Sequence, residues 1–362
     1  VTLPSCSSFA AAVSGGADSM AMLYALASLR AEKEKKNMRP LDLLCVHIDH
    51  SLRGEESTED ARFVKNTCEK LGIPCAIYTL EPGSIYEKAR RQKCGIEAAA
   101  REARFKALKK EAAQAGAERI LIAHTYDDFL ETILMRILRG AGPAGLAPMR
   151  RDTGLVYRPL LAVSRNDVLA YLTERNLPWR EDSSNTGMAF TRNRTRHKLI
   201  PVLNKHFPNW QKNIAAFAET QRFVSNLLAH YANEHIRYIN ANEVHIDNFN
   251  TLPPLAAEEA LFAAINYISR QDSAAGGGAG GFSFDDILPP PDGKTERTRT
   301  VKRAVLRKWA AGKTSTLDMG QYCAFHLPDG SVRVTRKPPP LSGCGFSLAL
   351  KRGDAMTVIK HP

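Results

Sequence analysis

The chain of 362 residues has no C-x-x-C pair among its seven cysteines, and it has no long hydrophobic run. An odd number of cysteines without that motif predicts reduced thiols, with neither a disulfide framework nor a zinc site. No apolar run approaches the roughly 20 residues that cross a bilayer, and the opening VTLPSCSSFA does not have the layout of a signal peptide. We therefore expect a soluble, cytoplasmic protein with no membrane partner.

The sequence does contain an ordinary globular mixture with an excess of positive charge. Hydrophobic residues make up 44% and charged residues 24%, and 362 residues exceed what one compact core usually serves. The formal net charge is +12 and the isoelectric point is about 9.4. We expect two or more domains and a polyanionic partner, with nucleic acid as the leading candidate.

Short apolar runs alternate with amphipathic stretches in the first part of the chain. Strands are predicted at 9–13, 41–48, 75–80 and 119–124, and helices at 18–30, 57–71, 96–114 and 127–138. This repeated order predicts an α/β domain with a parallel sheet and helices on both faces. Ligands of such folds bind at the carboxyl ends of the strands. Three segments follow strand ends and are therefore candidates for the site: SGGADS, DHSLRG and HTYDD.

The segment SGGADS joins the first predicted strand to its helix. Gly15 and Gly16 allow a positive φ and close approach of a ligand, and Ser14, Asp18 and Ser19 lie where free N–H groups of a helix start point outward. These groups and the helix dipole form an anion site. The lysine of G-x-x-x-x-G-K-[ST] is missing, which excludes a kinase-like P-loop. A phosphate cradle with an aspartate for Mg²⁺ fits cleavage that releases pyrophosphate, and a serine-capped turn is the alternative interpretation.

SGGADS resembles the SGGxDS signature of the PP-loop ATP pyrophosphatases, which adenylate a carbonyl oxygen and then displace AMP. Four further segments narrow the resemblance: HIDHSLRGEESTEDARFV, AHTYDDFLETILMRILRGAGPAGLAPM, RPLLAVSR and WREDSSNTGMAFTRNRTRHKLIPVL. In their order and spacing they resemble the bacterial tRNA(Ile)-lysidine synthetases over about residues 9–205. The resemblance implies a Rossmann-like catalytic domain and a ligase that forms a carbon–nitrogen bond. The implied reaction attaches free L-lysine to C2 of the first anticodon cytidine of tRNA(Ile) with a CAU anticodon, using ATP and Mg²⁺ as cofactors.

The resemblance also implies a nucleotide site at the first two strand ends. We expect ATP to bind Ser14, Gly15, Gly16, Asp18, Ser19, Asp49 and His50, with Asp18 also holding the metal. Asp49 and His50 end the second predicted strand, so their side chains can reach the adenosine or the phosphate tail. A polar strand end packed against a loop is the alternative for this pair.

Three acids open the fourth predicted helix. Glu131 lies four residues after Asp127 and three after Asp128, so it can share a helix face with either of them, away from the apolar stripe of that helix. An attacking lysine arrives as an ammonium and must lose a proton, which an acid can attract and then accept. Asp127 is the first choice for this base and Glu131 the second, with Asp128 contacting substrate. Acids in a first turn are also favoured by the dipole without any function.

Two positions depart from the family pattern. Phe129 stands where the family usually has glutamine, and Ser51 stands where it commonly has glycine. A glutamine can orient a substrate by hydrogen bonds and a phenylalanine cannot. If Phe129 contacts lysine or ATP, the geometry of the substrate site differs from that of the family. If it faces a neighbouring helix, the site changes little.

Basic residues gather after the acidic helix. Arg139 begins the run RGAGPAGLAP, which is predicted to be too flexible for a helix and suited to bring backbone near a nucleotide. The segment TRNRTRHKL contains Arg192, Arg194 and Arg196, and arginines pair with phosphates and stack on bases. These four arginines are expected to contact tRNA or substrate. A solvated helix face is the alternative for the second segment.

The sequence changes character after the catalytic motifs. We expect a catalytic domain at 1–206, a mainly helical tRNA-docking domain at 207–337, and a tail or remnant of a further domain at 338–362. The predicted elements of the second domain are helices at 209–240 and 255–270, a mobile glycine-rich insert at 273–281, a basic helix at 294–314 and a hairpin at 319–337.

Three other functions compete with the lysidine reaction. A PP-loop tRNA thiolase is the first alternative, and such enzymes generally use cysteine pairs, of which the chain has none as C-x-x-C. A PP-loop amide synthetase for a small metabolite fits poorly with the basic second half. A non-catalytic RNA binder fits poorly with the intact SGGADS and acidic helix. Whether the chain forms a homodimer stays open.

Overall fold

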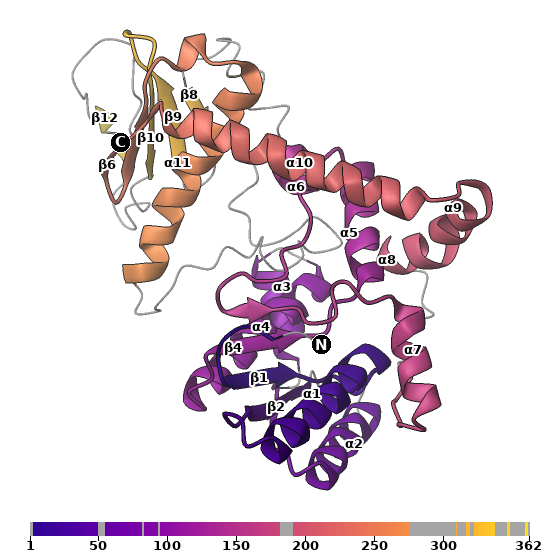
Figure 1. Cartoon of the computed structure of the whole chain (residues 1–362). Helices are drawn as coiled ribbons and strands as arrows, with labels where there is room; N and C mark the ends of the chain where they lie inside the picture. Colours follow the sequence, from indigo (N-terminus) through magenta and orange to yellow (C-terminus); the bar gives the residue numbers. More distant parts are fainter. Residues whose placement is uncertain are drawn as a thin grey trace. The chain divides into compact units, whose positions relative to one another are not determined.

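The computed structural model describes residues 3–49, 55–81, 83–92, 95–181, 191–275, 309, 316–318, 322–336, 346–347 and 359–360 (Figure 1). The chain divides into two compact units. Of the described residues, those up to Leu227 belong to the first unit and those from Leu228 onward belong to the second.

The first unit is built on a parallel five-stranded sheet, as predicted. Its strands are β1 (Ser8–Ala12), β2 (Asp42–Asp49), β3 (Cys75–Thr79), β4 (Arg119–Ile122) and β5 (Val156–Tyr157). Their order is β3-β2-β1-β4-β5, and every neighbouring pair is parallel. The four longer strands match the predicted ones, while the two residues of β5 are too few to give a periodic signal.

Helices connect these strands along the chain. The predicted ones are α1 (Ala17–Lys35), α2 (Glu55–Lys70), α4 (Ile96–Gln114) and α5 (Tyr126–Leu138). The structure adds α3 (Ser84–Gln92), α6 (Pro143–Leu146), α7 (Arg165–Glu174), α8 (Thr191–Arg194), a π-helical turn η2 (Thr195–Leu199) and α9 (Ile200–His206). The long helix α10 (Trp210–Asn233) follows and corresponds to the start of the helix predicted at 209–240. The expectation that RGAGPAGLAP contains no helix was wrong, because Pro143 at the first helical position starts the single turn α6.

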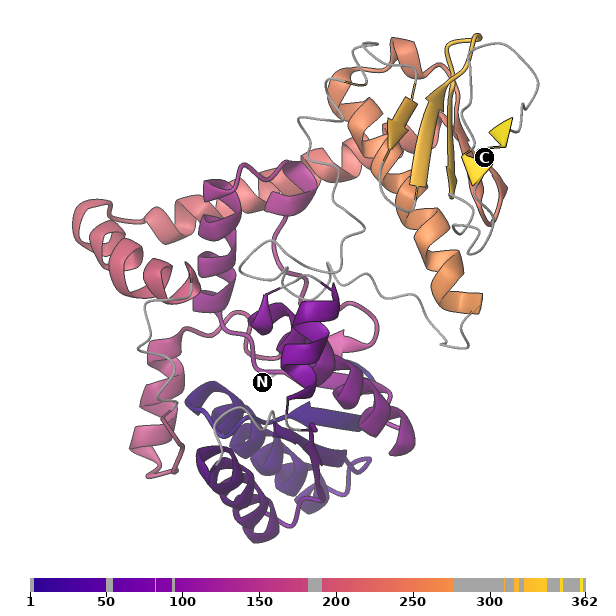
Figure 2. The ribbon, with the colours of Figure 1, turned by 180° about the vertical axis from the view of Figure 1, so that it is seen from behind.

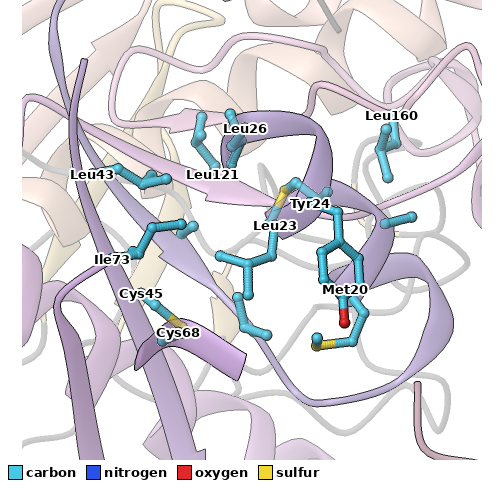
Figure 3. Close-up of a cluster of buried hydrophobic side chains, with 14 of the residues drawn as sticks. Met20, Leu23, Tyr24, Leu26, Leu43, Cys45, Cys68, Ile73, Leu121 and Leu160 are labelled. Atoms are coloured by element: carbon cyan, nitrogen blue, oxygen red, sulfur yellow. The ribbon is translucent and has the colours of Figure 1, made fainter. Parts of the chain in front are cut away.

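The alternation of side chains along β1 divides the core into two layers. Phe9, Ala11 and Val13 pack with residues of α1, α2 and α7 on one face of the sheet, whereas Ala10 packs with residues of α4 on the other. The first layer is the larger, and Figure 3 shows its centre, where Met20, Leu23 and other side chains of α1 meet β2. Helices therefore cover both faces, which is the arrangement that the strand–helix order predicts.

The strand order indicates where a ligand would bind on the sheet. From β1 the sheet continues to β2 and β3 on one side and to β4 and β5 on the other, so the topological switch lies between β1 and β4. In open α/β sheets the ligand crevice lies at the carboxyl ends of the strands at this point. The turn after β1 carries SGGADS, and the turn after β4 carries HTYDD.

A separate apolar cluster joins α5 to the helices that follow it. Phe129 is 7% exposed and packs among Leu130, Ile133, Trp210 and neighbouring side chains of α9 and α10. Its ring centroid lies 5.8 Å from that of Tyr126. Phe129 therefore faces neighbouring helices. Of the two alternatives, this is the one in which the replacement of glutamine changes the site little.

The second unit contains a sheet that was not predicted. The antiparallel order is β6-β7-β10-β9-β8, and α11 packs on β7 and β10 (Figure 2). The elements are β6 (Ile236–Asn240), β7 (Glu243–Ile246), a 3₁₀ turn η3 (Phe249–Thr251), α11 (Pro254–Ala275), β8 (Thr316–Asp318), β9 (Tyr322–His326) and β10 (Val332–Arg336).

Three predictions for this part can be compared with the structure. The hairpin around Pro328-Asp329-Gly330 is confirmed by the pairing of β9 with β10, and the helix at 255–270 is confirmed by α11. The helix predicted to run to residue 240 was wrong at its end, because the chain turns after Asn233 and its β-branched and aromatic residues enter the sheet as β6.

Other predictions for this part lie largely outside the described residues. They are most of the glycine-rich insert and the basic helix at 294–314, of which only Trp309 is described. Within the tail, β11 (Phe346–Ser347) pairs with β12 (Ile359–Lys360). The domain bounds 1–206 and 207–337 stay a prediction. None of the described helices has the length and apolar character of a membrane span.

The packing of Phe129 generates a stability prediction. Phe129→Gln should lower the free energy of unfolding by about 3 kcal/mol, because it removes a buried ring and leaves an amide without water. Phe223→Gln is the matched control on α10, where the ring is 71% exposed, and it should change stability by less than about 0.5 kcal/mol. Urea unfolding measures both, and equal losses in the two variants would contradict the assigned packing.

Candidate active site

The turn between β1 and α1 is held open by its own hydrogen bonds. Gly15 has φ +93°, a conformation that a side chain rarely adopts, although an added Cβ would meet only Val64 Cγ2 at 3.6 Å and Phe63 Cδ1 at 3.9 Å. The Ser14 amide donates to Ser19 Oγ at 3.1 Å, and Ser19 Oγ donates to the Gly16 carbonyl at 2.9 Å. No side chain caps the start of α1. The predicted anion cradle therefore has a preformed backbone with N–H groups at its mouth.

A second segment supports this turn from outside. The amide of Arg180 donates to the Gly15 carbonyl at 3.0 Å. The Arg180 side chain bonds Glu59 at 2.9 Å and also pairs with Asp60, both on α2. Gly15 is thus linked to α2 through Arg180. Nothing in the local sequence indicates this contact.

Asp18 lies in the first turn of α1 and has only one of its oxygens bonded. Its Oδ2 accepts from Arg165 Nη1 at 2.6 Å, while Oδ1 is buried and has no hydrogen-bond partner. Burial raises the pKa of Asp18 to about 6, with the Arg165 guanidinium opposing and nearby Asp128 adding to the rise. A buried carboxylate oxygen without a donor is what a hard cation such as Mg²⁺ can satisfy.

Arg165 brings the two strand ends together. Besides its ion pair with Asp18, its backbone amide donates to Asp127 Oδ2 at 2.7 Å. Arg165 is the first residue of α7, directly after the Ser164 cap, so its amide is one of the free N–H groups of a helix start. The predicted acids of α1 and α5 therefore share one site. Arg165 lies in the quoted segment RPLLAVSR but was not predicted as a site residue.

Asp128 caps the N-terminus of its own helix, α5. Its Oδ2 accepts from the Thr125 amide at 2.9 Å and from Thr125 Oγ1 at 3.2 Å, which completes a capping box. Burial favours the neutral form, yet the charges of Arg192 and Arg196 and the hydrogen bond from the Thr125 amide lower the pKa of Asp128. Asp128 is thus a fixed negative charge beside Asp127.

Glu131 is enclosed by two of the predicted RNA-contacting arginines. Its side chain is 1% exposed and accepts from Arg196 Nε at 2.6 Å and Arg196 Nη2 at 3.1 Å, and Arg192 Nε lies 3.1 Å from Oε2. Burial raises the pKa of Glu131, and both guanidinium groups oppose that rise. The π-helical turn η2 carries Arg196 toward this acid. Arg192 and Arg196 therefore hold α8 and η2 on α5.

The remaining predicted residues lie apart from this cluster. Arg194 is exposed, and its Nη2 donates to Thr191 Oγ1 at 3.1 Å. Arg139 is exposed at the other end of α5, about 18 Å along the axis from Asp127. Asp49 is buried at the end of β2. The predicted nucleotide contact His50 and the departure at Ser51 lie outside the described residues.

A hydrogen-bonded pair of the half-buried His124 and the buried Arg158 was also missed. Arg158 is fully buried, and its Nε donates to His124 Nδ1 at 3.1 Å, while its Nη1 donates to the Arg150 carbonyl at 2.7 Å. Burial and the positive charge of Arg158 hold the pKa of His124 well below its usual range, although Asp128 acts against them. His124 is therefore neutral, with its proton on Nε2.

The glycine turn without a lysine at the switch point of a parallel sheet defines a PP-loop nucleotide-binding domain. A family model described as "PP-loop domain" matches residues 4–203. Curated relatives named tRNA(Ile)-lysidine synthase match as well. One from Solibacter usitatus is 38% identical over 336 residues, which cover 91% of this chain and 68% of that relative. The chain belongs to the tRNA(Ile)-lysidine synthase family.

Other matches cover less of this chain. A tRNA(Ile)-lysidine synthase from Treponema pallidum (strain Nichols) is 40% identical over 213 residues, 58% of this chain and 43% of the relative. The chain thus spans less than half the length of that relative. A solved U34-tRNA thiolase from Methanococcus maripaludis, which has a [4Fe-4S] cluster, aligns with a TM-score of 0.47 and 20% identity over 59% of this chain and 71% of that chain. That similarity is too low to bear on function.

The raised pKa of Asp18 generates a prediction on stability and pH. Because the folded pKa of about 6 lies above the ordinary aspartate pKa of 3.8, the ionised form is disfavoured in the folded state, and stability is lost as pH rises through this window. The free energy of unfolding of Asp18→Asn should equal that of the wild type below about pH 4. Above about pH 7 it should be higher than that of the wild type by about 1 to 3 kcal/mol. Chemical denaturation across pH measures the difference.

Asp167→Asn is the control with the opposite sign. Hydrogen bonds from Ser164 lower the pKa of Asp167, so its contribution is present at neutral pH and lost as pH falls through the lowered value. This variant should be less stable than the wild type at pH 7. A loss of stability at pH 7 in Asp18→Asn as well would mean that the Arg165 pair outweighs burial at Asp18.

Proposed function

We propose that this protein is a carbon–nitrogen ligase that attaches lysine to C2 of the first anticodon cytidine of tRNA(Ile), releasing pyrophosphate and AMP through an adenylated RNA intermediate. The observation that carries the proposal is the double contact of Arg165 with Asp18 and Asp127. This contact supports a single site in which a phosphate-type turn and an acid suited to a lysine substrate act together. Membership of the lysidine synthase family supports the same reaction.

The turn after β1 is the proposed ATP site. The N–H groups at the start of α1, with Ser14, Gly15, Gly16 and Ser19, suit the phosphate chain, and Asp49 lies at the neighbouring strand end. Mg²⁺ fits this site because Asp18 Oδ1 is buried without a donor. Asp18 would hold the ion, which neutralises charge on the departing pyrophosphate when bound.

Asp127 is the proposed base for the incoming lysine. It is half-buried and accepts a backbone hydrogen bond from Arg165, whereas Asp128 is bonded in the capping box and Glu131 is bonded on both oxygens. Asp127 and Asp128 together attract the ammonium group, and Asp127 takes its proton before attack. We assign Glu131 to holding Arg192 and Arg196 rather than to proton transfer.

Mass spectrometry of the RNA product tests the function. An isoleucine tRNA with cytidine at the first anticodon position is incubated with the protein, ATP, Mg²⁺ and labelled lysine. One labelled lysine on that cytidine, with AMP and pyrophosphate released in equal amounts, is the expected result. A product that carries sulfur instead would favour the tRNA thiolase, and lysine-independent use of ATP with another acceptor would contradict the proposal.

The assignment of Asp127 predicts an uncoupling of the two half-reactions. Asp127→Asn keeps the shape of the side chain but cannot accept the lysine proton, so lysine attack should slow by about 10² to 10⁴ while adenylation persists. Adenylated tRNA should then accumulate in a rapidly quenched reaction. If adenylation slows by the same factor, Asp127 acts on ATP or metal.

The exposed Arg194 is proposed to contact a tRNA phosphate. Each lost phosphate contact reduces the slope of log affinity against log salt by about 0.7 to 0.9. Arg194→Ala should show this reduction with the fold intact. Arg194→Lys is the matched control and should restore most of the slope, since a lysine keeps the charge. Filter binding at several salt concentrations measures it, and an unchanged slope in Arg194→Ala would identify a solvated helix face.

A further inference from the structure

Three cysteines from three different elements meet in the first unit. Cys45 of β2, Cys68 of α2 and Cys75 of β3 place their sulfur atoms within 4.8 Å of one another. Cys45 and Cys68 are fully buried, and Cys75 is half-buried. Figure 3 shows Cys45 and Cys68 beside Ile73. The sequence predicted reduced thiols and no zinc site, because the chain contains no C-x-x-C pair.

The backbone fixes this thiol cluster. Cys45 and Cys75 are register partners on the neighbouring parallel strands β2 and β3, and the Cys45 amide donates to the Pro74 carbonyl at 2.8 Å. The Cys68 carbonyl accepts from the Ile73 amide at 3.0 Å, in a turn where Gly72 has φ +64°. Sheet register and helix end together hold the three sulfurs, so a ligand would find them preorganised.

The surroundings of the cluster favour a thiolate at its more open member. Hydrogen bonds from Cys45 and Cys68 lower the pKa of Cys75, and burial acts against them. The His47 Nδ1–H donates to the Val13 carbonyl at 2.8 Å, which fixes the ring. Negative charge on sulfur is therefore supported at the side where the cluster approaches solvent.

We propose that Cys45, Cys68 and Cys75 bind a single soft metal ion of the Zn²⁺ class through three sulfur ligands, with solvent completing the coordination beside Cys75. A Zn–S distance of about 2.3 Å sets sulfurs in a tetrahedral site about 3.8 Å apart, and the three sulfurs here are at most 4.8 Å apart. An iron–sulfur cluster would separate its ligands more widely. Binding releases the thiol protons to solvent and leaves three thiolates on a divalent ion.

The metal would act as a structural clamp, independent of the proposed ligase reaction. Asp49, at the carboxyl end of β2, lies four residues beyond Cys45, which corresponds to about 13 Å along the strand. Cys45 is in register with Ala11, three residues before Ser14 of the ATP turn, so the cluster lies within the sheet and is separate from the turn itself. Ion binding would join β2, α2 and β3 and stabilise the folded state by mass action.

Cadmium titration of the full chain tests the site. The protein is reduced with a non-chelating phosphine, stripped of metal and titrated with Cd²⁺, whose thiolate complexes absorb in the ultraviolet. The expected result is a charge-transfer band that saturates at one equivalent, together with a raised unfolding temperature. Cys68→Ser and Cys75→Ser should each weaken Cd²⁺ binding by more than about 100-fold, beyond the effect of losing an outer-shell partner.

Cys323→Ser is the matched control, because Cys323 is a half-buried thiol on β9 of the second unit. It should leave the band and the temperature shift unchanged. Cys75→Ser alters the least buried member, so it keeps the test decisive if Cys68→Ser does not fold. No band at one equivalent, or an equal band in Cys75→Ser, would overturn the proposal and identify the thiols as small apolar core residues. Neither readout depends on ligase activity.

Discussion

The contact of Arg165 with two carboxylates is the interaction on which the arrangement of the site depends. Asp18, Asp127 and Asp128 come from two helices that follow neighbouring strands, and three close negative charges repel one another. The guanidinium of Arg165 offsets Asp18, and its amide fixes Asp127. The start of α7 thereby joins the phosphate turn to the acidic helix. Because Asp18 still has a pKa of about 6, the site retains unfavourable electrostatics that ligands can relieve.

The parallel sheet could be predicted from the sequence, while the contacts between its loops could not. Four strands and their helices gave periodic signals, and the glycine turn of SGGADS indicated its own backbone. Arg165 and Asp18 are 147 residues apart, and no local pattern links them. The charge run TRNRTRHKL could not show that Arg192 and Arg196 fold back on Glu131 while Arg194 stays exposed. Which arginine finds an acid is decided by tertiary packing.

The same limit explains the second unit and the thiol cluster. The strands β6 to β10 contain three to five residues each, and β7 pairs with β10 far along the chain, so neither periodicity nor a turn signal marks the sheet. Cys45, Cys68 and Cys75 are spread over two strands and a helix, outside any metal-ligand spacing. Their proximity follows from sheet register and the end of α2. Only the P-D-G hairpin, a local feature, was visible in advance.

The burial of Phe129 against α9 and α10 has an evolutionary consequence. Two residues after Asp127, this position belongs to the interior of a helix cluster that includes Trp210 and Ala218. Selection on it therefore acts through fit to those partners, and substitutions there should be epistatic with theirs. In family members that carry glutamine at this position, the residues corresponding to Trp210 and Ala218 are expected to covary with it, offering a polar partner or a path to water.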